Sequence, residues 1–135
     1  SLLTRLRQQW PGAQLVHRLD RDTSGLVLLA LDPALHRALS QLFAERLVRK
    51  TYRADVAGVP LEQAGCITLA IGKRSDRPPL YGPDPTGKPC RTDWRVLGTV
   101  PDQGWSRLEL TPHTGRYRLH ERVISVHIAK TYLTI

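Results

Sequence analysis

Residues 17–25 of the chain read His-Arg-Leu-Asp-Arg-Asp-Thr-Ser-Gly, between a short β-like run at 14–16 and the apolar run at 26–31. We interpret this stretch as a charged turn between two buried strands. Charges beside apolar strands need a partner or solvent, because an unpaired carboxylate near a core is costly. A turn that holds two aspartates and two arginines at this place is therefore a candidate site.

The two aspartates of this turn differ in their local surroundings. Asp22 begins an Asp-Thr-Ser-Gly turn, in which an aspartate at the first position bonds the backbone ahead of it. Asp20 has no such local use; Arg21 follows it, and Arg18 shares its face if the strand stays extended. Neighbouring guanidinium groups lower the pKa of a carboxyl group and keep it charged. Asp20 is thus the candidate for chemistry, and the alternative is an ordinary turn with solvated Arg–Asp pairs of little energetic weight.

The composition favours one folded, basic domain. The 135 residues contain 20 Lys and Arg against 12 Asp and Glu, a net charge of +8, and 41% of them are hydrophobic. That hydrophobic content is ordinary for a globular domain, and the basic excess favours a polyanionic partner. No apolar run is long enough to span a membrane, and the spacing of Cys66 and Cys90 does not indicate a zinc site or a disulfide framework. We expect a reduced, cytoplasmic setting, and Ser1 in place of a Met indicates a fragment or a processed chain.

The pattern of apolar residues predicts an α+β fold. A short helix is expected at 2–9, and a second helix begins at Asp32-Pro33 with an apolar stripe that should cover the sheet. Strands are expected at 49–56, 66–71, 91–97 and 105–110. Residues 72–88 contain four prolines and little periodicity, which predicts a long irregular loop. The basic residues of this loop either bind the phosphates of a polyanionic partner or are merely solvated.

The stretch at 17–25, followed by its apolar run, closely resembles the signature of the RluA family of pseudouridine synthases, and we call it the signature stretch. Three further blocks are similar to family motifs and occur in the family order: Lys-Thr-Tyr-Arg-Ala-Asp-Val at 50–56, Thr-Gly-Lys-Pro-Cys-Arg-Thr at 86–92 and Pro-His-Thr-Gly-Arg at 112–116. The resemblance is greatest to members that modify both large-subunit ribosomal RNA and transfer RNA. It implies the catalytic fold of pseudouridine synthases, in which flanking helices accompany a mixed, mainly antiparallel sheet.

The resemblance also implies a reaction, the isomerisation of uridine to pseudouridine in ribosomal or transfer RNA. Asp20 is then the catalytic residue, either as a nucleophile at C1′ or as a base at C2′. Tyr52 would stack on the flipped uracil, and Arg18 would fill the gap left by the base or pair with Asp20. Arg21 and Arg116 complete the expected substrate-binding set. We expect a monomer with no membrane partner. We also expect no metal or cofactor, since the uracil never leaves the site.

The sequence after Arg116 departs from the family pattern. Family members continue with a His-Gln-Leu-Arg-Val-His-like helix, whose arginine faces the catalytic aspartate, whereas residues 117–122 here read Tyr-Arg-Leu-His-Glu-Arg. Neither Arg118 nor Arg122 falls in the family's frame, so no arginine is assigned as the partner of Asp20. We therefore expect a single catalytic domain, residues 1–135, that is incomplete at both termini. The alternative to a synthase is a truncated, non-catalytic fragment that still binds RNA.

Overall fold

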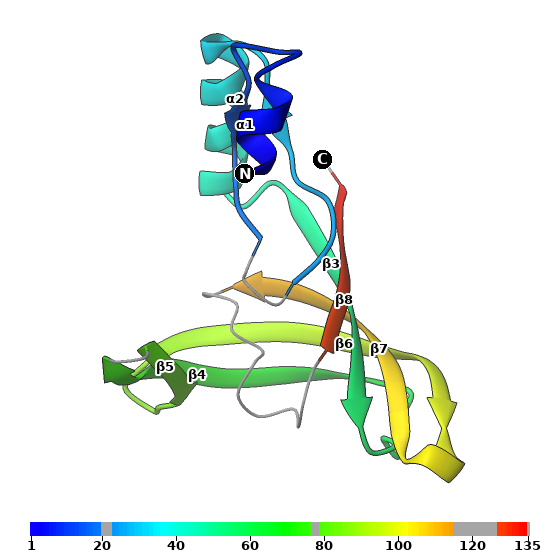
Figure 1. Cartoon of the computed structure of the whole chain (residues 1–135). Coiled ribbons are helices and arrows are strands. Elements are labelled where there is room, and N and C mark those ends of the chain that lie inside the picture. Colours follow the sequence, from blue (N-terminus) through cyan, green and yellow to red (C-terminus); the bar gives the residue numbers. More distant parts are fainter. Residues whose placement is uncertain (20–22, 77–78, 115–126, 135) are drawn as a thin grey trace.

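The computed structural model describes residues 1–19, 23–76, 79–114 and 127–134 (Figure 1). The elements in chain order are α1 (Leu2–Leu6), β1 (Gln14–Leu15), β2 (Leu29–Ala30), α2 (Pro33–Ala44), β3 (Arg49–Ala57), β4 (Ala64–Asp76), β5 (Pro79–Pro83), β6 (Lys88–Val100), the 3-10 turn η1 (Pro101–Gln103), β7 (Trp105–Thr114) and β8 (His127–Thr134). The predicted α+β class is confirmed. Neither described helix is long and apolar enough to cross a membrane.

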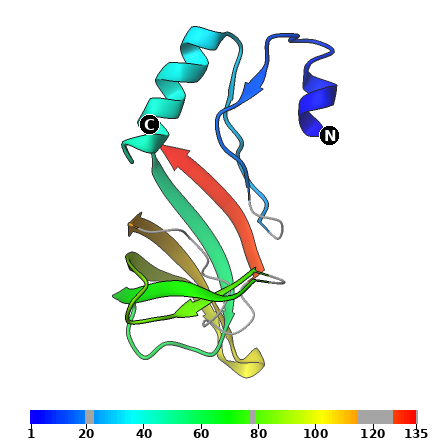
Figure 2. The same ribbon diagram turned by 90° about the vertical axis from the view of Figure 1, so that its left-hand side faces the viewer.

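The larger sheet has six strands in the order β5-β4-β6-β7-β3-β8, and every pair of neighbours in it is antiparallel. The four predicted strands are present as β3, β4, β6 and β7, most of them longer than expected. β4 pairs with both β5 and β6, and β6 pairs with β7, whereas β3 lies between two strands that follow it much later in the chain (Figure 2). This arrangement places the start of β3 and the end of β7 at one end of the sheet.

One face of the larger sheet carries the small core of the molecule. Its buried members are Ala54 and Val56 of β3 and Leu108 and Leu110 of β7. Partly buried side chains pack against this cluster, namely Tyr52, Trp94 and Val96. The residues that β3 contributes are spaced by two, because successive side chains of a strand point to opposite faces. Tyr52 therefore belongs to the face of the sheet that holds the core.

The opposite face of the sheet is ionic. Cross-strand pairs join Asp55 to Arg107 at 2.7 Å, Arg95 to Glu109 at 2.9 Å and Asp93 to His113 at 2.6 Å. These side chains remain substantially exposed, so each pair contributes little to stability. Charged side chains and core side chains alternate along β3 and β7. This alternation determines which face of each strand packs against the core.

The expectation of a long irregular loop at 72–88 is wrong. β4 continues to Asp76, β5 pairs with it, and only residues 84–87 form the turn into β6. Asp84 organises that turn, since its Oδ1 accepts hydrogen bonds from the backbone N–H and the hydroxyl of Thr86 at 2.9 and 2.8 Å. The prolines are compatible with the strand because β5 is at the edge of the sheet, where a missing N–H costs no ladder bond on the outer side.

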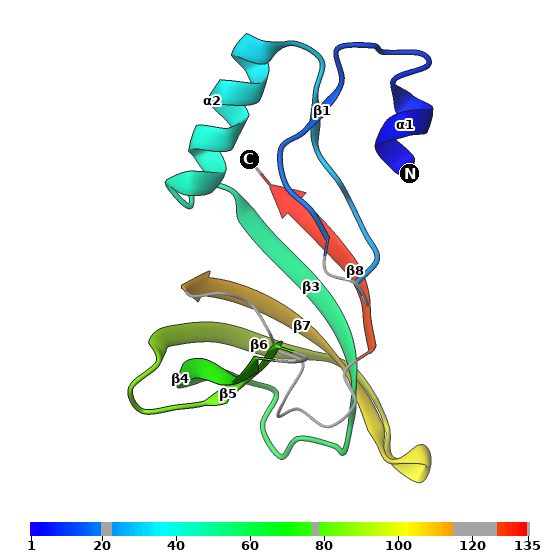
Figure 3. The ribbon, with the colours of Figure 1, turned by 60° about the vertical axis from the view of Figure 1, so that its left-hand side comes forward.

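The second helix begins where the sequence predicts. Asp32 caps α2, with its carboxylate accepting the N–H of Leu35 at 2.8 Å, and Pro33 occupies the first turn. However, α2 lies against β1 and β2 and does not cover the six-stranded sheet (Figure 3). None of its residues is buried, so its apolar stripe is only partly covered.

The apolar run at 26–31 is not the buried strand that was expected. Only Leu29 and Ala30 pair with β1, and Ala30 alone is fully buried. Leu26 and Leu31 are 53% and 52% exposed. β1 and β2 thus form a short two-stranded ribbon, and the described parts of the signature stretch, residues 17–19 and 23–25, continue from its two strands (Figure 3).

Candidate functional site

At the base of the signature stretch, the side chain of His17 accepts a hydrogen bond from the backbone of the opposite segment. The pairing of β1 with β2 extends to the N–H of Val16, which donates to the carbonyl of Leu28 at 3.2 Å. The next bond would need another backbone acceptor, but the N–H of Leu28 donates instead to Nε2 of His17 at 3.0 Å. The imidazole therefore takes the place of a backbone acceptor for this N–H.

His17 must be neutral to accept this bond, with its proton on Nδ1. Partial burial lowers the pKa of His17 below its usual value of 6.5, and the charge of Lys50 adds a smaller lowering. A backbone hydrogen bond at Arg18 acts in the opposite direction. The net effect favours the neutral ring that the Leu28 N–H requires.

We expect this bond to make stability depend on pH. A histidine with a lowered pKa in the folded state contributes its full stability above about pH 6.5, and it loses that contribution as the pH falls through the folded pKa. The loss should reach about 1 kcal/mol, the worth of one such hydrogen bond. His17→Gln keeps an acceptor that does not titrate, so its free energy of unfolding should fall less between about pH 7 and pH 5. Urea titrations at the two pH values measure this, and equal losses in both proteins would contradict the assignment.

The ring of Phe43 joins the signature stretch to β3. His17 stacks on Phe43, with ring centroids 4.8 Å apart and an interplanar angle of 19°. Nζ of Lys50 lies over the same ring, 5.4 Å from its centroid. The start of the signature stretch, the end of α2 and the Lys-Thr-Tyr block of β3 therefore meet around one aromatic side chain.

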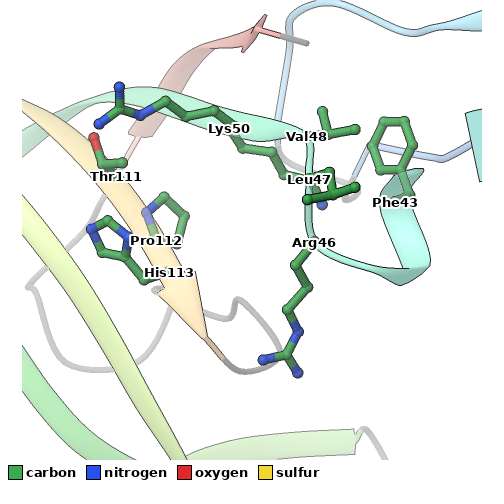
Figure 4. Close-up of a pocket in the computed structure, with 9 residues that line it drawn as sticks. Phe43, Arg46, Leu47, Val48, Lys50, Thr111, Pro112 and His113 are labelled. Atoms are coloured by element: carbon green, nitrogen blue, oxygen red, sulfur yellow. The ribbon is translucent and has the colours of Figure 1, made fainter. Parts of the chain in front are cut away.

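A pocket of about 440 Å³ opens beside this joint (Figure 4). It is lined by Phe43, Arg46, Leu47, Val48, Arg49, Lys50, Thr111, Pro112 and His113. The paired register of β3 and β7 begins at Tyr52 and Leu110, so the pocket lies where the two strands have not yet joined. The lining residues that the structure describes include three cationic side chains and no carboxylate, and we call this the basic pocket.

Tyr52 lies at the edge of the basic pocket. Its neighbour across β7 is Leu110, and it shares a face of β3 with Lys50, two residues earlier. The side chain of Tyr52 is half-buried and packs against the core cluster. The core thus holds the ring of Tyr52, and Lys50 of the same strand lines the pocket.

The wall of the pocket on β7 is fixed by a hydrogen bond. Nε2 of His113 lies 2.6 Å from Oδ2 of Asp93. The hydrogen bond with His113 is the largest cause of a lowered pKa at Asp93, followed by a hydrogen bond with Cys66. Across the ranges that the structure describes, no group of three or more His, Cys, Asp or Glu side chains could hold a metal ion.

The other predicted site residues are only partly placed. Arg18 is exposed and follows the joint at His17. Asp20, Arg21 and Arg116 lie outside the described residues, so their roles stay predictions.

A comparison with known protein families decides the ancestry of the chain. Residues 4–120 match the model of the RNA pseudouridylate synthase family. The chain belongs to this family. The matched region includes all four sequence blocks noted above, and the predicted recognition is confirmed.

The chain is also similar to individual members of the pseudouridine synthase family. The chain is 42% identical over 113 residues to an uncharacterized RNA pseudouridine synthase of Zymomonas mobilis, covering 81% of this chain and 49% of that protein. It is 39% identical over 117 residues to the dual-specificity RNA pseudouridine synthase RluA of Yersinia pestis, covering 86% of this chain and 56% of that protein. The solved structure of human RNA pseudouridylate synthase domain containing 1 superposes with a TM-score of 0.76 at 34% identity, covering 86% of this chain and 51% of that one. The chain therefore spans about half the length of these relatives.

In this pseudouridylate synthase domain, the basic pocket gathers residues from two of the sequence blocks and from α2. Lys50 comes from the second block and His113 from the fourth, while His17 of the signature stretch stacks on Phe43 in its wall. Neither Arg46 nor Phe43 was singled out from the sequence.

The backbone of Arg46 carries a signal that sequence reasoning missed. Arg46 has φ of 59°, a left-handed conformation that costs a residue with a side chain about 1 kcal/mol. Its N–H donates to the carbonyl of Phe43 at 3.1 Å, and the N–H of Leu47 donates to that of Leu42 at 2.9 Å. This bonding pattern ends many helices, and glycine usually occupies the left-handed position. An arginine occupies that position here, and only the structure reveals its left-handed conformation.

Proposed function

We propose that the protein is an RNA pseudouridine synthase that isomerises specific uridines in ribosomal RNA, transfer RNA or both. The match of residues 4–120 to the family, which includes the signature stretch, carries this proposal. The two-substrate expectation is supported by the similarity to the dual-specificity enzyme of Yersinia pestis. We further propose that the enzyme is cytoplasmic and acts as a monomer.

The chemistry needs one carboxylate, which we assign to Asp20. The bond between N1 of uracil and C1′ of ribose breaks, the uracil turns, and a bond forms between C5 and C1′. The proton on C5 is removed and N1 gains one, so atoms and charge balance without an oxidant or water. Asp20 would act by attacking C1′ or by taking the proton from C2′. Glycosidases need a second carboxylate to handle water or a leaving oxygen, and neither takes part here.

The substrate uridine must leave the RNA stack to reach such a carboxylate. Loops and flexible turns of RNA are favoured targets, because opening them costs less than opening a duplex. We assign Tyr52 to stack on the flipped uracil, and its packing against the core supports this by holding the ring in place. Arg18 would fill the gap left by the base, with Arg21 and Arg116 contacting the RNA.

We expect Tyr52→Phe to keep more activity than Tyr52→Ala. Stacking needs only the ring, and base–aromatic stacking is worth about 1–3 kcal/mol. The alanine variant should therefore lose about fivefold to a hundredfold in affinity for a uridine-containing RNA, while the phenylalanine variant changes little. Urea unfolding of both variants shows whether they are folded under assay conditions. Equal losses in two folded variants would show that the ring is not what matters.

The direct test is conversion of uridine in ribosomal and transfer RNA transcripts. Release of tritium from RNA labelled at C5 of uridine measures the reaction, because the proton at C5 is lost. Product formation by the 135-residue chain supports the proposal. Tight, salt-dependent RNA binding without product would favour the non-catalytic fragment. Absence of both would overturn the proposal and leave only a basic scaffold of the same ancestry.

A further inference from the structure

We propose that the basic pocket is a binding site for a backbone phosphate of the RNA, with Arg46 as its main ligand. This inference rests on the proposed function and extends it to a nucleotide beside the modified uridine. Arg18 and Tyr52, the described residues to which the family resemblance assigns a role, do not line this pocket.

The charge of the pocket selects an anion. Arg46, Arg49 and Lys50 are among its lining residues, and no carboxylate is found among the lining residues that the structure describes. The nearby Asp93 pairs with His113 on the β7 wall, so that carboxylate already has a partner. A concave site with three cations in its lining attracts a phosphate more strongly than scattered surface charges do.

The backbone of Arg46 indicates that its side chain is kept for a purpose beyond folding. The left-handed conformation at this position favours glycine, yet the chain has an arginine. The Arg46 side chain forms no ion pair or hydrogen bond with any residue that the structure describes. It extends from the end of α2 into the space opposite His113 (Figure 4). Nothing in the described fold therefore uses the guanidinium, and its position leaves it open to a ligand.

The remaining lining suits the sugar and base attached to that phosphate. Phe43, Leu47, Val48 and Pro112 make an apolar wall beside the cations. A pocket of about 440 Å³ is within the usual range for small-molecule sites and can admit one nucleotide. Lys50 lines the pocket and lies two residues from Tyr52 on the same strand. A nucleotide in the pocket would therefore lie next to the expected uracil site. The pocket thus has the chemistry of an RNA nucleotide site: charge on one side and an apolar surface on the other.

The sharpest test is Arg46→Gly, because its effects on folding and on binding should have opposite signs. Glycine relieves the left-handed strain, so the urea midpoint of unfolding should rise. Affinity for a fluorescein-labelled single-stranded oligouridylate should fall about tenfold at low salt. The slope of log affinity against log salt should become shallower by about 0.7, the value for one phosphate contact to single-stranded RNA. Fluorescence anisotropy over a salt series measures both quantities on the full chain.

Two further variants and a control define the outcome. Arg46→Ala should lose the same affinity without the gain in stability, and Arg46→Lys should retain part of the affinity. Arg37→Ala removes the same charge from an exposed position of α2 outside the pocket, and it should leave the salt slope unchanged. If the unchanged chain binds the RNA and Arg46→Gly binds it with the same affinity and slope, the phosphate site is wrong while the proposed function stands. If the unchanged chain shows no salt-dependent RNA binding, the proposed function fails and the phosphate site fails with it.

Discussion

Replacing Asp20 with asparagine should abolish isomerisation while leaving RNA affinity nearly unchanged. An amide has almost the shape of a carboxylate, but it is neither a nucleophile nor a base under these conditions. The rate of tritium release should fall by at least about a thousandfold, since the only group assigned to the chemistry has been removed. Anisotropy with the same RNA should show affinity within about twofold of the unchanged chain, because phosphate contacts dominate binding.

The matched control for this change is Asp22→Asn. Asp22 is assigned to a turn, and asparagine bonds the backbone of such turns as aspartate does. This variant should therefore keep most of the activity of the unchanged chain. Product formation by a purified Asp20→Asn enzyme at the rate of Asp22→Asn would show that the signature aspartate is not the catalytic group.

Leu110→Ala should produce the largest loss of stability of any single substitution considered for this chain. Leu110 is 3% exposed and belongs to a core cluster of only four fully buried side chains. Truncating a buried leucine costs about 2–5 kcal/mol through lost burial and the cavity left behind. That loss is a large part of the roughly 5–15 kcal/mol by which ordinary domains are stable. The variant should be largely unfolded at temperatures where the unchanged chain is folded, which urea titration followed by circular dichroism will measure.

Leu61→Ala provides the control for this prediction. Leu61 is 102% exposed, so the same truncation removes almost no buried surface. Its unfolding midpoint should match that of the unchanged chain within about 0.5 kcal/mol. If Leu110→Ala is as stable as Leu61→Ala, the cluster of β3 and β7 is not the core that holds the sheet.

The sequence predicted those elements whose signals are local. Asp32-Pro33 marks the start of a helix through a cap and a fixed φ, and the structure begins α2 at Pro33. The alternation of residues at 49–56 likewise predicted a strand, which the structure contains as β3. These signals depend only on neighbours in the chain, so they can be interpreted without knowing the fold.

Other parts of the fold depend on contacts that no local pattern reports. Four prolines and weak periodicity at 72–88 indicated a loop, because the sequence alone does not show that β5 lies at an edge where proline is tolerated. The apolar run at 26–31 indicated a buried strand, but only Leu29 and Ala30 have a partner strand among the described residues. The burial of residues 26–31 depends on which segments pack on the ribbon, and tertiary contacts of this kind cannot be inferred from the local sequence.

The candidate site divides in the same way. Asp20 and Tyr52 could be proposed because long motifs surround them in the sequence. The basic pocket could not be anticipated as a unit, since it exists only where the end of α2 approaches the end of β7. Arg46 contributes to it through a backbone conformation that only the structure reveals.

The position of β3 in the sheet sets an order of assembly. Short connections join the four strands from β4 to β7, so these strands can pair as soon as they are synthesised. β3 precedes them in the chain but must wait for β7 and β8, and its nearest pair with β7 joins Ala57 to Trp105. Such non-local closure is slow, because the entropy of a long loop is lost before contacts compensate for it. Since β3 carries Lys50 and Tyr52 while β7 carries His113, the proposed RNA site forms only when β3 docks on β7.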